Sequence, residues 1–320
     1  KDKHIILNCD QTMRIDSVKF KGQELQYMHN DILHTLHISC IFNEENAQGR
    51  IMIAISFTGF LNNDEKQGFI YIDDSTCALH LFPNFSSLFI PNDIMNECID
   101  FNLYNISGNV VVEKADQIVI SSFPFPQVSK FIREQKMFKF SAEEACPLQY
   151  FSMVIGKYKL FENQSSLPGM QTKLFLYYDE NVESQNIDSI FSFLATSIFA
   201  IEKIFNLSTN CIQIVDVIDF PENESNTFGL IIFTPETLNS FTENKHFIIK
   251  QIIKQLLHLF PATANECWII EGLSSYLAFV ILPLIDTFVQ NEFDFGSIMK
   301  VDIENYQLQC FRKALNSDND

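Results

Sequence analysis

Two apolar segments in the last third of the sequence constrain the fold most. Between Phe247 and Phe260, isoleucine, leucine and phenylalanine recur every three or four residues, which is the spacing of one apolar face on an α-helix. Pro261 follows, and proline cannot continue a helix interior. A second apolar repeat begins near Asn265 and runs to Phe279. The sequence therefore predicts two successive helices joined by a short connection.

The first half of the chain instead has the alternating pattern of β-strands. Apolar and polar side chains alternate over residues 13–20, 36–42 and 51–57, and Lys21-Gly22 separates two such runs as a turn. Many short strands between polar turns indicate an all-β layer for residues 1 to about 150. From residue 187 onward, helical and strand patterns alternate.

Several motifs resemble the zinc aminopeptidases related to aminopeptidase N. The segment from Trp268 to Phe279, WIIEGLSSYLAF, is similar to the family's WLNEGFASYLAY, and residues 55–63, ISFTGFLNN, resemble its I.FSGKLND. The resemblance covers residues 3 to about 279 in collinear order. It implies an α+β fold in which an N-terminal all-β saddle domain, residues 1–178, precedes a thermolysin-like α/β domain, residues 179–320. That second domain would be incomplete, since it lacks the C-terminal helical domain that family members usually carry.

The same resemblance implies a catalytic zinc site whose positions are altered here. In the family, His-Glu-x-x-His on the first helix supplies two zinc ligands and the general base, and the Glu that corresponds to Glu271 is the third ligand. The closest register places Lys250 at the first His, Gln251 at the Glu and Lys254 at the second His. An ammonium group cannot ligate zinc, and a neutral glutamine cannot accept a proton from metal-bound water.

Two other registers of this helix remain open, and neither restores the zinc ligands. One places Lys254, Gln255 and His258 at the three positions, and the other places Ile248 and Ile252 at the two ligand positions. We therefore predict no catalytic residues, no metal of the family's type and no cofactor in any register.

A second functional motif of the family is also altered. Residues 223–230 lie where the family has GAMENWGL, whose Glu holds the free amine of the substrate. Phe228, Gly229 and Leu230 fit this motif, but Asn226 occupies the position of the amine-binding Glu. The structural positions match while the chemical positions do not, which is the pattern of a non-catalytic descendant.

This pattern resembles that of the aminopeptidase-like subunits of the general transcription factor TFIID. It implies a nuclear scaffold whose partners are other protein subunits of a larger complex. The formal net charge of -18 argues against a broad phosphate-binding surface. A limited contact with promoter DNA is left to the one basic run, which comprises Lys130, Arg133, Lys136 and Lys139.

Two alternative functions stay open at this stage. One is a divergent but active zinc aminopeptidase. The other is a secreted or surface pseudo-aminopeptidase that binds a peptide or protein, which would suit five N-x-S glycosylation sequons at Asn84, Asn105, Asn163, Asn206 and Asn223. The longest apolar run, residues 273–285, is short and contains Pro283, so we expect no membrane-spanning segment and no membrane partner.

Overall fold

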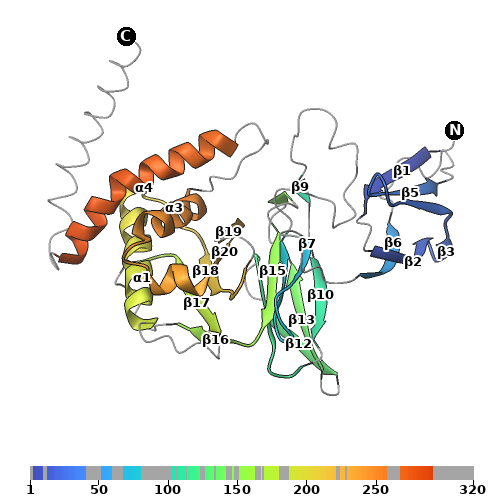
Figure 1. Ribbon diagram of the computed structural model, residues 1–320, viewed down its shortest axis with the longest axis horizontal. Helices are drawn as coiled ribbons and strands as arrows, with labels where there is room; N and C mark the ends of the chain where they lie inside the picture. Colours follow the sequence, from blue (N-terminus) through green and yellow to red (C-terminus); the bar gives the residue numbers. More distant parts are fainter. Residues whose placement is uncertain are drawn as a thin grey trace, which may run out of the picture.

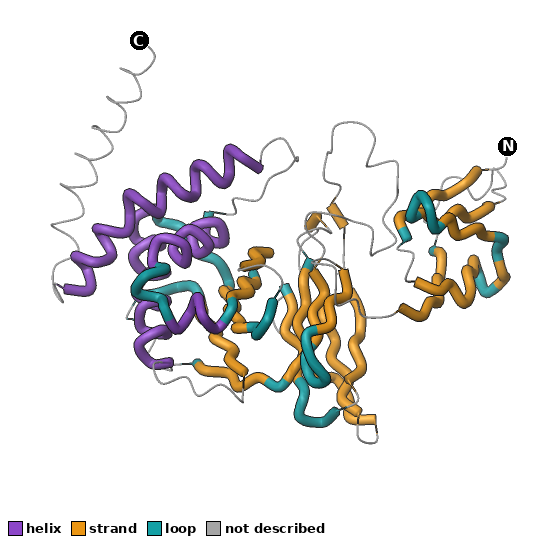
Figure 2. Tube along the Cα trace, in the orientation of Figure 1, coloured by secondary structure: helices purple, strands orange, loops and turns teal. Residues whose placement is uncertain are grey.

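The computed structural model of the 320-residue chain is shown in Figure 1. It describes residues 3–9, 13–40, 52–59, 68–80, 103–104, 107–112, 114–122, 127–132, 135–141, 146–147, 151–162, 167, 169–179, 187–220, 224–227, 229–257 and 267–290. Within these residues, helices gather on one side of the strands (Figure 2).

Two small antiparallel sheets form the N-terminal unit. The first contains β1 (Lys3–Asn8), β5 (Thr35–Cys40) and β4 (Tyr27–Asn30), and the second contains β3 (Gln23–Glu24), β2 (Met13–Phe20) and β6 (Ile53–Gly59). Apolar side chains from both sheets pack into one cluster that includes Val18, Leu36 and Ile38. The predicted turn at Lys21-Gly22 is confirmed, since both residues have positive φ and join β2 to β3.

Two further antiparallel sheets pack face to face in the middle of the chain. A four-stranded sheet has the order β11 (Ile118–Ser121), β15 (Ser152–Gly156), β8 (Cys77–His80), β7 (Gly68–Tyr71), and a three-stranded sheet has the order β10 (Ser107–Val112), β13 (Gln135–Ser141), β12 (Gln127–Ile132). Leu79, Val119 and Met153 of the first sheet bury their side chains against Val112 and Phe138 of the second. The short strands β9 (Leu103–Tyr104) and β14 (Cys146–Pro147) pair separately.

A five-stranded mixed sheet follows and carries the helices. Its order is β16 (Tyr158–Phe161), β17 (Lys173–Asp179), β18 (Cys211–Asp216), β20 (Leu230–Phe233), β19 (Glu224–Thr227), with β17, β18 and β20 parallel. Every residue of β18 and β20 is buried. Such continuous burial is typical of parallel strands covered on both faces.

Helices cover one face of this sheet, and the four-stranded sheet covers the other. The helices are α1 (Ile187–Phe205), α2 (Pro235–Asn239), α3 (Lys245–Leu256) and α4 (Cys267–Gln290). Ile212, Ile214 and Phe233 pack against apolar residues of α1, α3 and α4. On the opposite face, Val215 and Ile232 pack against residues of β7, β8, β11 and β15. The elements from β7 onward, apart from β9 and β14, thus form a stack of helices, five-stranded sheet, four-stranded sheet and three-stranded sheet.

The predicted fold class is wrong. We expected an all-β saddle domain followed by a thermolysin-like α/β domain, but the described residues form mainly small β-sheets, and no thermolysin-like α/β domain is evident among them. Hydrophobic periodicity identifies single helices and strands, but it does not show which distant strands pair. Because strand pairing determines the size of each sheet, the sheets could not be predicted from this pattern. The five-stranded sheet joins strands from both sides of the predicted domain boundary between residues 178 and 179. The division into two domains stays a prediction.

The two predicted C-terminal helices are confirmed as α3 and α4, but α4 is longer than expected. It continues through Pro283 to Gln290. Among the described residues it is the one helix that is long and apolar enough to cross a membrane by length and composition alone, over Trp268–Ile285. The expectation that no apolar run reaches such a length is therefore wrong.

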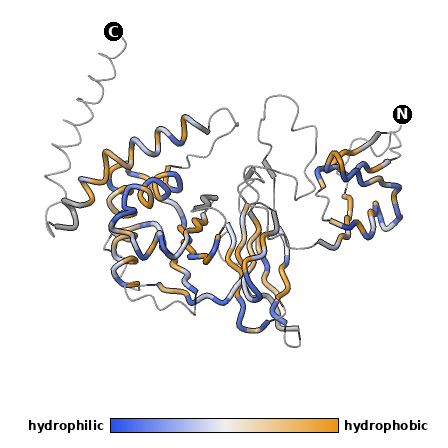
Figure 3. The backbone as a smooth tube through the Cα atoms, viewed as in Figure 1, coloured by the Kyte–Doolittle hydropathy of each residue, from blue (hydrophilic) through white to orange (hydrophobic). Residues whose placement is uncertain are grey.

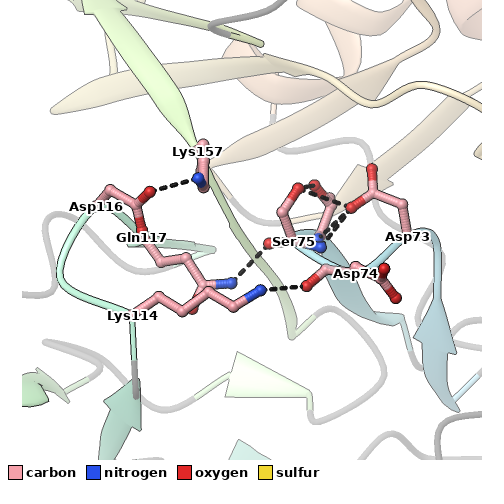
Figure 4. A network of polar contacts seen from close by, with 8 residues as sticks. Asp73, Asp74, Ser75, Lys114, Asp116, Gln117 and Lys157 are labelled. Carbon is pink, nitrogen blue, oxygen red and sulfur yellow. Dashed lines mark hydrogen bonds and ion pairs between the residues drawn. The ribbon is translucent and has the colours of Figure 1, made fainter.

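A polar network ties the turn between β7 and β8 to neighbouring strands (Figure 4). The Asp73 carboxylate accepts hydrogen bonds from the amides of Ser75 and Thr76 at 2.6 and 2.8 Å. Burial acts to raise the pKa of Asp73, but a hydrogen bond from the Ser75 hydroxyl, together with those from the two amides, outweighs it and lowers the pKa below its ordinary value. Lys114 and Gln117 donate to the carbonyl oxygens of Asp74 and Ser75, which fixes the turn against the segment before β11.

A buried carboxyl group lies at the carboxyl end of β18. Asp216 is 5% exposed, and its Oδ1 accepts a hydrogen bond of 2.8 Å from the amide of Asp179 at the end of β17. Burial raises the pKa of Asp216 to about 7, and the nearby Asp179 charge acts in the same direction. Tyr158, buried beside both, has a pKa raised by burial and by the charges of Asp216 and Asp179.

We therefore expect stability to fall as the pH rises from about 4 to about 7. In the folded state Asp216 keeps its proton up to about pH 7, whereas in the unfolded chain it loses the proton near pH 4. Over this range ionisation stabilises the unfolded chain alone, so the free energy of unfolding decreases by up to about 4 kcal/mol. Asp216→Asn removes this dependence and flattens the curve of stability against pH, measured by urea unfolding at pH 5 and pH 8. Equal slopes in the variant and the parent chain would show that Asp216 ionises normally.

Candidate functional site

The packing of α3 against α4 brings two lysines onto one glutamate. Lys250 and Lys254 are four residues apart on α3 and therefore lie on the same side of the helix. Lys250 Nζ lies 2.6 Å from Glu271 Oε2, and Lys254 forms an ion pair with Glu271 Oε1. The apolar face of α3, with Ile248 and Ile252, is turned to the core.

Burial makes this ion pairing obligatory for the lysines. The side chains of Lys250 and Lys254 are only 16% and 10% exposed, while that of Glu271 is 48% exposed. A buried ammonium needs a partner, because removing it from water is costly. Burial acts to raise the pKa of Glu271, but hydrogen bonds and charge from Lys250 and Lys254 outweigh it and lower the pKa below its ordinary value. The carboxylate is therefore held in its charged form.

The other predicted positions are placed as follows. Gln251 is buried on α3, and Asn226 lies in β19 opposite Ile231. Ile248 and Ile252, which the third register places at the ligand positions, are fully buried in the helical core. His258, needed by the second register, lies outside the described residues. The arrangement of Lys250 and Lys254 on Glu271 corresponds to the first register.

A buried polar network beside this cluster was missed by sequence reasoning. The Thr227 hydroxyl at the end of β19 lies 3.0 Å from Ser122 Oγ and 2.7 Å from Ser152 Oγ, both of which belong to the four-stranded sheet region. All three residues are buried. Gln213 on β18 adds a hydrogen bond of 2.7 Å to the carbonyl oxygen of Ser121. These contacts join the five-stranded and four-stranded sheets through hydrogen bonds as well as apolar packing.

Gln255 connects this network to α3. Its side-chain amide donates to the carbonyl oxygen of Thr227 at 2.5 Å and accepts from the amide of Gly229 at 2.9 Å. Gly229 has a φ of +74°, and a Cβ there would lie 2.8 Å from the carbonyl oxygen of Ser122. Glycine is therefore required both by the backbone conformation and by the close approach. The sequence does contain a signal for this network: Gln255 lies on the apolar face of α3, and a buried amide side chain needs hydrogen-bond partners.

The comparisons with known proteins support the fold. A search of the solved structures found aminopeptidase A of Legionella pneumophila, in complex with aspartic acid, at a TM-score of 0.60 and 15% sequence identity. The fold is aminopeptidase-like. The match covers 78% of this chain and 30% of that one, so the chain spans less than a third of the structure that it matches. No protein-family model and no curated protein matches the sequence.

The residues present do not fit the zinc that an aminopeptidase-like fold would imply. Zinc takes thiolate, imidazole and carboxylate donors, whereas Lys250 and Lys254 offer only N–H donors. Their ammonium groups already take both oxygens of the Glu271 carboxylate. Among the described residues, no group of three or more His, Cys, Asp or Glu side chains is placed to hold a metal ion. The cluster is suited to fixing α3 and α4 together through charge.

Removal of one ammonium should change the titration of Glu271. Lys254→Met leaves the carboxylate with Lys250 alone, so we expect the pKa of Glu271 to move upward in the variant. The measurement is an NMR titration of the side-chain carboxyl carbon. Lys173→Met, at an exposed position on β17, serves as the control and should leave that pKa unchanged. An unchanged pKa in Lys254→Met would show that the ion pair does not form in solution.

The contacts of Gln255 should be worth more to stability than its size suggests. Gln255→Leu leaves the Thr227 carbonyl oxygen and the Gly229 amide without this partner, which we expect to cost about 3 kcal/mol. Gln23→Leu, at an exposed site in β3, should change stability by less than about 0.5 kcal/mol. Chemical unfolding of both variants measures the difference, and equal losses would contradict the role of Gln255.

Proposed function

We propose that this chain is a non-catalytic, aminopeptidase-like module that acts by binding other proteins. The contact that supports the proposal most is the pairing of Lys250 and Lys254 with Glu271. In the family resemblance, these are the positions of the two imidazole ligands and of the third zinc ligand. Ammonium groups at the first two positions neither ligate a metal nor leave the carboxylate available to one.

The general base and the amine-binding residue are altered as well. Gln251 stands where the resemblance has the base Glu, and Asn226 stands where it has the Glu that binds the substrate amine. A neutral amide takes no proton from water and offers no charge to an ammonium group. Hydrolysis of an N-terminal residue needs all of these functions together, so their joint replacement favours a role in binding.

The partners we propose are protein subunits of a larger complex, of the TFIID type, in the nucleus. The support is the resemblance in pattern to the aminopeptidase-like subunits of that factor. Contact with promoter DNA would be limited because the chain carries a net charge of -18. Lys136 and Lys139 on β13 belong to the basic run available for such a contact.

A second candidate function is a secreted pseudo-aminopeptidase that binds a peptide or protein. One observation favours it: the sequon residue Asn206 is exposed directly after α1. Mass spectrometry of the protein from its natural source tests this candidate. A glycan on Asn206 would replace the nuclear assignment with a secreted one, and an unmodified Asn206 in all molecules would remove the support for secretion.

Metal analysis provides the main test of the proposal. The full chain, incubated with excess zinc and dialysed, should retain no stoichiometric zinc and should release no N-terminal residue from peptide substrates. The triple variant Lys250→His/Gln251→Glu/Lys254→His restores the ligand types beside Glu271, and we expect it to retain about one zinc per chain. Adding Glu271→Gln to the triple variant should abolish that retention, which serves as the control.

Two outcomes would overturn the proposal. One is stoichiometric zinc on the parent chain that disappears in Glu271→Gln, since this would place a metal where the lysines lie. The other is peptide hydrolysis that a chelator abolishes and added zinc restores. Either result would favour the alternative of a divergent active zinc aminopeptidase.

A further inference from the structure

The cluster of Lys250, Lys254 and Glu271 carries one positive charge in excess. Two ammonium groups and one carboxylate sum to +1. The two helices that form the cluster do not correct this locally, since α3 contains no Asp or Glu and the stretch Trp268–Ile285 of α4 contains Glu271 alone. Apolar residues extend along much of α4, which lies at the edge of the molecule (Figure 3). The excess charge therefore lies in mainly apolar surroundings.

Burial of the two lysines makes this excess charge costly. The side chains of Lys250 and Lys254 are almost fully removed from water, and a buried ammonium needs an anion in place of that water. Among the residues that the structure describes, Glu271 is the one acceptor that either ammonium contacts. Each ammonium carries three N–H donors, so the pair has more donors than the carboxylate has oxygen atoms. A second anion would supply both the missing charge and the missing acceptors.

The cluster is open to solvent on the side of Glu271. The Glu271 side chain is 48% exposed, and a Cβ at the adjacent Gly272 would meet no atom within 4 Å. Trp268, three residues before Glu271 and therefore on the same side of α4, is 75% exposed. A dissolved ligand can thus approach the two ammonium groups beside the Glu271 carboxylate.

We propose that Lys250 and Lys254 bind a carboxylate group of a partner polypeptide. The proposal rests on the proposed function as a protein-binding module and names the chemical group on the partner. A carboxylate carries one negative charge, which balances the +1 of the cluster. A phosphoryl group carries roughly two negative charges at neutral pH and would leave an excess of the opposite sign in the same apolar surroundings. A peptide amine would be repelled, so the polarity of the ligand is the reverse of that in the family resemblance.

Glu271 competes with the ligand for the same two ammonium groups. Its removal raises the charge of the cluster from +1 to +2, whereas removal of one lysine lowers the charge to zero. A carboxylate site therefore predicts effects of opposite sign, with tighter binding in the first case and weaker binding in the second. A cluster that only holds α3 and α4 together predicts a loss in both cases, because both changes break the same ion pairs.

The test titrates the full chain with uncharged, N-acetylated pentapeptides that contain no tryptophan. One has a free C-terminus, the second is amidated, and the third is amidated with a central aspartate. The emission of Trp268, the single tryptophan of the chain, reports binding near Glu271. We expect saturation by a peptide that carries a carboxylate and no response to the second peptide. Binding of the first alone assigns a chain terminus, and binding of the third alone assigns an acidic side chain.

Three peptide results would overturn the proposal. The first is binding of neither carboxylate peptide. The second is equal binding of the neutral amidated peptide, which would show that charge does not select the ligand. The third is tighter binding of a phosphoserine peptide than of the aspartate peptide, which would replace a carboxylate by a dianion as the ligand.

Variants of the cluster provide the decisive comparison. Glu271→Gln should bind the carboxylate peptide at least about tenfold more tightly than the parent chain, and Lys254→Met at least about tenfold more weakly. Lys173→Met, at an exposed position on β17, should leave the affinity unchanged. Circular dichroism checks the folding of each variant, and Lys250→Met replaces Lys254→Met if the latter is unfolded. Weaker binding by Glu271→Gln in a folded chain would overturn the proposal.

The same preparation separates this proposal from the proposed function. Zinc content and peptidase activity are measured first, and the peptide titrations follow after treatment with a chelator. An active zinc-containing chain whose chelated form still shows the opposite effects of Glu271→Gln and Lys254→Met refutes the proposed function alone. A metal-free, inactive chain that binds no carboxylate peptide refutes this inference alone.

Discussion

Burial of both faces of the five-stranded sheet is the constraint on which the rest of the structure depends. The strands β17, β18 and β20 are apolar on both sides, so each face needs a cover that excludes water. The helices supply one cover and the four-stranded sheet supplies the other. Because α3 must lie on the sheet through its isoleucine face, its polar flank is forced toward α4. The position of Lys250 and Lys254 beside Glu271 follows from this packing.

Charge explains how ion pairs alone can hold the cluster at α3 and α4 together. In the family resemblance, two neutral imidazoles, one carboxylate and Zn²⁺ would sum to a charge of +1. Two ammonium groups and one carboxylate also sum to +1. The ion pairs therefore supply an attraction between the glutamate of α4 and α3 with the same net charge as the zinc site of the resemblance. Neutral replacements of the two lysines would leave the half-buried carboxylate without compensation.

The sequence predicted the parts of this structure that depend on local spacing. The helical repeats of α3 and α4 and the turn at Lys21-Gly22 required only a few neighbouring residues to interpret. Strand pairing was not predictable in this way. Lys173 of β17 pairs with Cys211 of β18, although the whole of α1 separates them in the sequence, and both strands have the same apolar pattern. The prediction of the fold class was wrong for this reason.

Long-range hydrogen bonds were equally hidden in the sequence. Ser122 and Thr227 are 105 residues apart, and neither belongs to a motif that would suggest a contact. The resemblance placed Lys250, Lys254 and Glu271 at zinc-ligand positions in one of three registers, but it predicted no ion pair among them, and one-turn spacing of two lysines is more often a solvated face. A resemblance to a family indicates which positions occupy the same place in the fold. It does not indicate polar contacts between sheets, because these depend on the particular side chains of this chain.

Pro283 shows how the exposed side of α4 and the length of this helix are connected. Proline removes the hydrogen bond that its nitrogen would give to the carbonyl oxygen of Phe279, four residues earlier, and for this reason its presence counted against a long helix across residues 273–285. Both residues lie on the exposed side of α4, where water can satisfy that carbonyl oxygen. The inner face keeps its contacts with the core through Ile281 and Ile285, so the helix continues. The proline is thus tolerated at an exposed position of α4, while the opposite side of the helix stays packed on the core.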